Sequence, residues 1–215
     1  MAALTELVAD VQVSIPEIPT FVAERQLLRA IREFCQETRA WRSNFQISVI
    51  ADLATVAMGS LLPSDTELVD IISVKNVGGG EPVHPATYSW LDKNRTDWRS
   101  ETDINAMYYV INSNNVLRLI PTPSTTTAQL YNVRACVKPT LGASAIDDLL
   151  ISHYREDFIN GALGYLYLIP RKPWTDLKLA QYHKASFVNS WTGARVAATE
   201  EFQTGIPRKV KYGGL

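Results

Sequence analysis

Three side chains that can bind a metal lie within about one helical turn of one another in the C-terminal half of the chain. His153, Glu156 and Asp157 are spaced by three and four residues, which puts them on one face of a helix. Such a set on a single helix is far more often a solvated or packed face than a metal site. The other histidines, His84 and His183, add no ligand spacing. We therefore predict no metal and no cofactor.

A run of three glycines, Gly78-Gly79-Gly80, follows a segment with the pattern of a β-strand. Glycine-rich loops can hold a phosphate when a Lys-Ser or Lys-Thr pair and the start of a helix come next. Neither follows here. We predict a hairpin tip instead, and we expect it to contact another protein chain.

Carboxylate pairs occur at Asp147-Asp148 and Glu156-Asp157, in or near the first two turns of a predicted helix. Carboxylates are favoured there because they cap free N–H groups and oppose the helix dipole. Capping and solvation thus explain both pairs. The sequence also lacks a Gly-x-Ser-x-Gly motif and a Cys–His or Ser–Lys arrangement. We predict that the protein is not an enzyme and has no catalytic residues.

The C-terminal segment, residues 199–215, is expected to form an extended tail with a basic cluster: Arg208, Lys209, Val210, Lys211 and Tyr212. Three cations with one aromatic ring are a weak signal for nucleic acid, because such sites combine charge with several stacking rings. An acidic protein surface is an alternative partner. We expect this tail to dock on another chain.

Composition and charge limit the class of protein. The chain has 215 residues, of which 46% are apolar, and its net charge is −1. It can bury a proper core as one domain or as a domain with an insertion, and it has no overall basic field for nucleic acid. Residues 1–170 carry 13 Lys and Arg against 19 Asp and Glu, whereas residues 171–215 carry 8 against 3. This asymmetry favours head-to-tail self-association or an acidic partner, although scattered solvated charge explains it equally well.

Two cysteines, Cys35 and Cys136, occur in a sequence without the pattern of a secretory signal. We expect both thiols to be reduced and buried. The longest apolar run, residues 161–169, is too short to span a bilayer. We therefore expect a soluble protein.

The strongest helical pattern covers residues 144–198, which we interpret as two helices joined by a proline-containing corner. Apolar residues recur every three or four positions in both halves. Ser144 is the expected cap of the first helix, and Pro170 is expected to end it. Pro173 suits the first turn of the second helix, whose backbone angle it fixes in advance.

Two glycines inside the first of these helices predict a close contact. Gly161 and Gly164 each weaken a helix by up to about 1 kcal/mol relative to alanine, so we expect something to pack against the backbone there. Two antiparallel helices also leave faces uncovered, and the other strong helical pattern is residues 21–41, with Thr20 as its expected cap. We predict a three-helix bundle made of this N-terminal helix and the C-terminal hairpin.

The hydrophobic period changes from 3.6 to 2 between the helical segments, which indicates β-strands. The predicted strands are residues 45–51, 68–77, 107–111, 116–120 and 128–137. Asn112-Ser-Asn-Asn115 predicts a hairpin turn, because asparagine tolerates positive φ. Residues 92–105 are expected to form a long polar loop that contains Arg95 and Trp98 and lies at an interface with another protein chain.

The predicted fold class is therefore α+β. A discontinuous helical domain is expected at residues 1–41 and 143–198, with an inserted antiparallel β domain at residues 42–142 that forms a sheet or a small sandwich. The termini are expected to be extended, including the tail at residues 199–215.

Short motifs in a fixed order give a resemblance to a known family. They are Phe34-Cys35-Gln-Glu-Thr38-Arg39-Ala40-Trp41, Val137-Lys138-Pro139, Gly161-Ala162-Leu163, Lys172-Pro173-Trp174, and Leu179-Ala180-Gln181-Tyr182 followed by Phe187. Their order and spacing are similar to those of the head-to-tail adaptors of short-tailed bacteriophages, also called tail tubular protein A or gatekeeper proteins. The resemblance covers the first helix, the last strand and the helical hairpin.

This resemblance implies a structural virion protein. About twelve copies would form a ring under the portal, and the ring would pass DNA during packaging and ejection without reading its sequence. The implied partners are other copies of the chain, the portal protein and the tail nozzle or tube protein, with no membrane. The implied location is the neck or tail of the virion, after assembly in the host cytoplasm.

Two other classes remain open at this stage. One is a small nucleic-acid-binding or regulatory module that uses the basic tail, and the other is an enzyme with an unrecognised site. A ring, alone or on the portal, would favour the adaptor. A monomer that binds DNA with a steep salt dependence would favour the second class.

Overall fold

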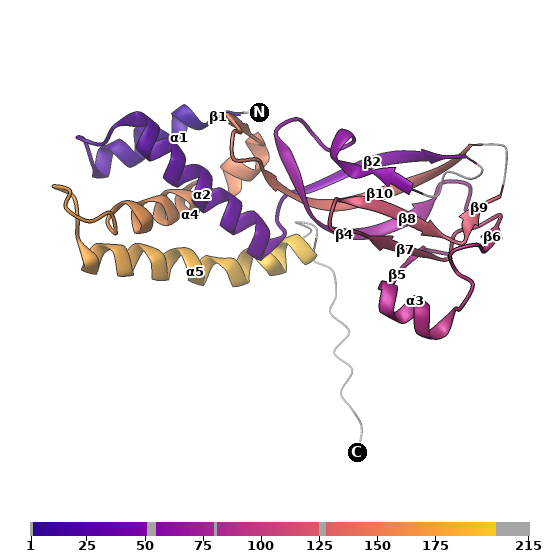
Figure 1. Ribbon diagram of the computed structural model, residues 1–215. Coiled ribbons are helices and arrows are strands. Elements are labelled where there is room, and N and C mark those ends of the chain that lie inside the picture. Colours follow the sequence, from indigo (N-terminus) through magenta and orange to yellow (C-terminus); the bar gives the residue numbers. More distant parts are fainter. Residues whose placement is uncertain (1, 51–54, 80, 125–127, 201–215) are drawn as a thin grey trace, which may run out of the picture. The chain divides into compact units, whose positions relative to one another are not determined.

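The computed structural model describes residues 2–50, 55–79, 81–124 and 128–200 (Figure 1). The chain divides into two compact units, Met1–Ala40 with Ala145–Leu215, and Trp41–Ser144. We call them the helical unit and the β unit. The predicted mixed α+β class is confirmed.

The helical unit combines four helices with a two-stranded ladder. Its elements are β1 (Ala2–Ala3), α1 (Leu4–Ser14), α2 (Thr20–Thr38), β11 (Ala145–Ile146), α4 (Asp148–Leu166) and α5 (Leu177–Thr199). Helix α2 packs against α1, α4 and α5, and α4 also packs against α1 and α5. An aromatic cluster joins α2 to α4: the centre of the Phe34 ring lies 4.8 Å from that of Tyr154 and 5.2 Å from that of Phe158.

The N-terminal segment differs from the extended terminus that we expected. Residues 4–14 form α1, because Leu4, Leu7, Val8 and Val11 follow helical spacing and are all buried. Arg155 on α4 donates to Asp10 on α1 at 2.8 Å. The described helical unit therefore contains a fourth packed helix in addition to the three predicted.

The boundaries of α4 also differ from those expected. Residues 145–146 pair with β1, so the chain is still extended after Ser144 and the helix begins only after Ile146. Asp147 is the cap in place of Ser144, and its carboxylate accepts from Leu149 N at 2.8 Å. At the other end, α4 stops at Leu166, before Pro170 is reached.

The start of α5 lies four residues after Pro173, which is therefore not in its first turn. Asp176 caps the helix and accepts from the backbone N–H groups of Lys178 and Leu179. Before it, the Thr175 hydroxyl donates to Ile169 O at 2.6 Å and accepts from Lys172 N, which closes the corner. A local side-chain network thus delays the helix despite the favourable proline.

The close contacts predicted at the two helical glycines are confirmed. A Cβ at Gly161 would lie 2.8 Å from Ala30 Cβ and 2.9 Å from the Phe187 ring. A Cβ at Gly164 would lie 3.2 Å from the backbone nitrogen of Lys184. These glycines let α2 and α5 approach the α4 backbone.

The β unit contains two main sheets and a short extra pair. Its elements are β2 (Arg42–Val49), β3 (Thr55–Ala57), the 3₁₀ helix η1 (Met58–Ser60), β4 (Thr66–Asn76), β5 (His84–Pro85), α3 (Tyr88–Asn94), β6 (Thr102–Asp103), β7 (Tyr108–Ile111), β8 (Val116–Ile120), β9 (Thr122–Pro123) and β10 (Gln129–Pro139). One sheet has the order β2-β10-β4, the other β3-β8-β7-β5, and β6 pairs with β9. The longer pairs are antiparallel, as predicted, whereas β5–β7 and β6–β9 are parallel.

The two main sheets form a small sandwich. One buried cluster includes Ile47 of β2, Val74 of β4 and Tyr131 of β10, together with Tyr109 of β7 and Leu117 of β8. Asparagines form the predicted hairpin turn between β7 and β8: the Asn112 side chain accepts from Asn114 N and Val116 N, and Asn115 has a φ of 56°.

The expected long polar loop is partly ordered into other elements. Its first residues belong to α3, and Thr102–Asp103 form β6. A second small core lies here, made of Leu91, Trp98, Val110 and Ile120. Val110 and Ile120 alternate along their strands with residues of the sandwich core, so this sheet buries both of its faces.

Both cysteines are buried thiols, as predicted: Cys35 lies in the helical unit and Cys136 in the β unit. In the described part of the chain, no helix combines the length and hydropathy needed to cross a bilayer.

Candidate interaction surfaces

Several residues predicted to meet a partner lie outside the described residues. These are Gly80 and the five tail positions Arg208, Lys209, Val210, Lys211 and Tyr212. The predictions for them remain as stated from the sequence.

Gly78 and Gly79 form a tight turn after β4. Gly78 N donates to the Asn76 carboxamide at 2.8 Å, and Gly79 has a φ of 93°, which glycine adopts without strain. The chain then returns along β4, because Val83 bridges to Val74. The glycines are thus at a hairpin tip.

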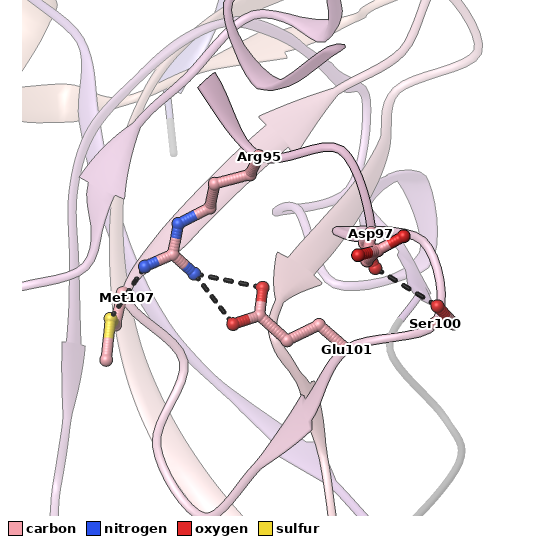
Figure 2. Close-up of polar contacts among 5 residues, drawn as sticks. All are labelled: Arg95, Asp97, Ser100, Glu101 and Met107. Atoms are coloured by element: carbon pink, nitrogen blue, oxygen red, sulfur yellow. Dashed lines mark hydrogen bonds and ion pairs between the residues drawn. The ribbon is translucent and has the colours of Figure 1, made fainter. Parts of the chain in front are cut away.

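Arg95 lies at the end of α3, and its side chain points toward two loop residues (Figure 2). Its Nη1 donates to both carboxylate oxygens of Glu101 at 3.0 Å, and its Nη2 lies 3.6 Å from Met107 Sδ. The guanidinium is also 5.1 Å from the centre of the Tyr108 ring. In the same loop, Ser100 donates to the Asp97 carbonyl. Arg95 therefore ties the loop to the start of β7.

Trp98 points inward, and its side chain is only 1% exposed. Its indole N–H donates to Asp92 at 2.9 Å, and the guanidinium groups of Arg99 and Arg118 lie 4.3 and 4.9 Å from the ring centre. The hydrogen bond and the two cation–π contacts fix the loop around the indole ring. A partner that meets this loop would therefore contact residues around Trp98 rather than the indole.

An aromatic hollow lies between the glycine turn and the Arg95 loop, and no local sequence pattern predicts it. Tyr108 is shared by two adjoining open cavities of about 280 and 400 Å³. The smaller is lined by Pro85, Ala86, Thr87, Trp90 and Tyr108, and the larger includes Gly79, Glu81, Pro82, His84 and Met107. Trp90 is 42% exposed, and its ring lies 5.2 Å from that of Tyr108. The structure thus brings Gly79 and the Arg95 contacts to one exposed aromatic surface.

The residues considered for metal binding are used in other ways. His153 Nδ1 lies 2.7 Å from Leu149 O on its own helix. Burial raises the pKa of the Asp157 carboxyl, an effect that a hydrogen bond from Ser190 partly offsets. Within the described residues, no three His, Cys, Asp or Glu side chains are grouped as metal ligands.

Comparison with known protein families gives one match, to the SU10 adaptor protein family, over residues 2–206. A comparison with curated proteins found no match. The family match includes both the helical unit and the β unit, as well as the glycine turn, the Arg95 loop and the aromatic hollow. The chain therefore belongs to the SU10 adaptor protein family, a family of phage head-to-tail adaptors.

Proposed function

We propose that the protein forms a ring of about twelve copies between the portal and the distal tail, with a channel through which DNA is packaged and ejected. The family match over residues 2–206 carries this proposal. Family membership by itself implies a structural component of the virion neck or tail that oligomerises and interacts with portal and tail proteins. In the proposal, assembly takes place in the host cytoplasm.

The charge of the chain supports a channel that does not hold DNA. The net charge is −1, so a ring of many copies would have no overall positive field. A strongly basic lumen would bind the phosphate backbone by releasing counterions and would slow DNA passage. We therefore expect no sequence-specific contact with DNA.

The helical unit and the β unit have different roles in this proposal. The helical unit, with its continuous core, forms the wall of the ring. The β unit faces outward or toward the tail, where the glycine turn (Gly78, Gly79, Gly80) and the loop that contains Arg95 and Trp98 meet a neighbouring subunit or the tail protein. The exposed Trp90 ring beside Tyr108 supports this role, because large aromatic side chains are common anchors at protein interfaces.

The basic tail is proposed to dock on the portal or nozzle through Arg208, Lys209, Val210, Lys211 and Tyr212. A chain that ends at residue 200 should fold normally, because the described cores of both units lie before that residue. We expect it to lose binding to the purified portal or nozzle protein in a pull-down assay. Unchanged binding by the truncated chain would contradict this role.

The ring itself can be tested by measuring mass with and without the portal. We expect the full chain and the portal protein of the same phage to form one complex with many adaptor copies, with adaptor density at the vertex in electron cryomicroscopy of virions. A monomer that binds DNA with a steep salt dependence would instead support the alternative, a nucleic-acid-binding or regulatory module that uses the tail. Virions without adaptor density at the vertex would contradict the proposal.

A further inference from the structure

The two outer sides of the helical unit carry opposite charge. Residues 1–24 contain Glu6, Asp10, Glu17 and Glu24 and no lysine or arginine. Glu6 on α1 and Glu17 in the following turn are exposed, whereas Asp10 is paired with Arg155. We call residues 4–24 the acidic edge.

Helix α5 has the opposite composition. Its 23 residues include Lys178, Lys184 and Arg195 and no acidic residue. Arg195 is bonded to Glu37. Lys184 lies over the Tyr165 ring and interacts with the Glu33 carboxylate, so these two charges are matched within the same unit. Lys178 is exposed at the start of the helix.

The outer face of α5 is also unusually apolar for a face in contact with water. Tyr182, Ala185, Asn189 and Val196 follow helical spacing on the side away from the buried Ala180 and Phe187, and all four are exposed. Tyr182 is 67% exposed and Val196 42%. A solvated helix face normally carries charged side chains, so this one has the composition of a packing surface. We call it the α5 face.

The acidic edge offers apolar side chains as well as charge. Val13, near the end of α1, is 82% exposed, and Phe21, in the first turn of α2, is 69% exposed. Each surface thus presents exposed apolar groups beside exposed charge. On the acidic edge the exposed charges are Glu6 and Glu17, with Arg25 one turn beyond Phe21, and α5 presents Lys178 at its start.

These two surfaces lie on different sides of the same unit. Helix α4 contacts both α1 and α5, and Figure 1 shows α1 and α5 at opposite sides with α4 between them. A symmetric contact of α5 with α5 would give Lys178 no carboxylate partner on the facing helix, which has no acidic residue. A contact between two acidic edges would bring Glu6 and Glu17 of both copies together. Only the unlike pairing has complementary charge.

We propose that the α5 face of one copy binds the acidic edge of the next copy. This inference rests on the proposed ring and names the surfaces that form it. Contacts between two different surfaces repeat from copy to copy, and they close into a ring when the rotation allows. The occupant of the α5 face is therefore a second copy of this chain.

Two charge-reversed variants test the proposal. One carries Glu6→Lys and Glu17→Lys on the acidic edge, and the other carries Lys178→Glu and Asn189→Glu on the α5 face. Mass photometry of the full chain with its portal protein measures the complex. We expect each variant alone to need at least a tenfold higher adaptor concentration than wild type to form it. An equimolar mixture should restore assembly, because alternating copies then pair opposite charges at every contact.

A control matched to the α5-face variant changes the net charge by the same −3 at positions elsewhere in the chain. Asn44→Glu, Ser48→Glu and Ser64→Glu alter exposed positions of the β unit outside the glycine turn and the Arg95 loop, and this variant should assemble like wild type. Tyr182→Ser removes an exposed ring without a charge change and should weaken assembly alone. Thermal unfolding of each variant checks that it folds.

The outcomes separate this inference from the proposed function. A ring formed by either reversed variant as readily as by wild type, or a mixture that fails to assemble, would overturn the paired surfaces while the ring stands. Equal loss in the control would attribute the effect to net charge and would also overturn them. A wild-type chain that stays monomeric on its portal would overturn the ring and the pairing together.

Discussion

The core of the helical unit and the Trp98 loop of the β unit are stabilised by different kinds of contact. In the helical unit, residues far apart in the sequence interlock: Tyr165 donates to the Glu33 carboxylate across 132 positions, and Gly161 admits Ala30 and Phe187. In the β unit, the small second core around Trp98 is held by short-range hydrogen bonds that Trp98 and Arg99 donate to the Asp92 carboxylate. Long-range packing therefore stabilises the helical unit, whereas short-range hydrogen bonds fix the conformation of the Trp98 loop in the β unit.

Removing one large buried ring from each unit gives the largest expected effects. Phe34→Ala and Trp98→Ala should each lower the free energy of unfolding by about 3–5 kcal/mol, because each leaves a cavity. Native-state hydrogen exchange should show the loss in α2, α4 and α5 for the first variant and around α3 and β7 for the second. The exposed rings Phe21 and Trp90 give matched alanine controls with little effect. Loss of protection throughout the chain from either substitution would show that the units do not open separately.

Within the helical unit, glycine-to-alanine substitutions distinguish a closely packed helix position from an exposed one. Gly161→Ala should destabilise by about 1–3 kcal/mol, because the new Cβ overlaps Ala30 and Phe187. Gly193→Ala should stabilise by about 0.5–1 kcal/mol, because no atom lies within 4 Å and alanine is the better helix former. Urea unfolding followed by tryptophan fluorescence measures both changes. Effects of the same sign would contradict the close packing at α4.

The two units should also respond oppositely to acid, with the smallest of these effects. Hydrogen bonds from Trp98 and Arg99 hold the pKa of Asp92 below its ordinary value of 3.8. The ionised Asp92 carboxylate therefore contributes to the stability of the folded state above pH 3.8, and this contribution is lost as the pH falls through the lower pKa of the folded state. Burial raises the pKa of the Glu33 carboxyl above 4.5 and that of Asp157 above 3.8. The protonated Glu33 and Asp157 carboxyls therefore contribute fully to the stability of the folded state below those ordinary values. This contribution is lost as the pH rises through the higher folded-state pKa values.

Neutral variants isolate the two effects. The stability difference between wild type and Asp92→Asn should shrink as the pH is lowered below 3.8. The variant with Glu33→Gln and Asp157→Asn should become more stable relative to wild type as the pH rises from 4 toward neutrality. Unfolding curves measured between pH 3 and 7 check both slopes, and slopes of equal sign would refute the contrast.

Local signals predicted much of the fold. The cost of glycine in a helix pointed to the close contacts at Gly161 and Gly164, and the asparagines at 112 and 115 form the expected hairpin. Predictions were wrong where a distant segment decides: Ser144 is not a cap because β11 pairs with β1. The polarity of its loop favoured a surface position for Trp98, although the indole is buried by its own neighbours.

The candidate surfaces were harder to predict, because separate segments build them. Trp90 and Tyr108 meet because β5 pairs with β7, a contact that no local pattern announces. The acidic edge and the α5 face likewise become opposite sides only once α4 lies between their helices.

The β unit is one continuous stretch of chain, whereas the helical unit is made of the two segments before and after it. This order has a consequence for synthesis on the ribosome. Residues 41–144 emerge as one uninterrupted stretch that holds every strand of both main sheets. Helix α2 emerges earlier but must wait for α4 and α5, so its apolar side stays uncovered meanwhile. The middle of this polypeptide can therefore fold before its beginning, and the N-terminal helices are the segment most in need of chaperone protection during translation.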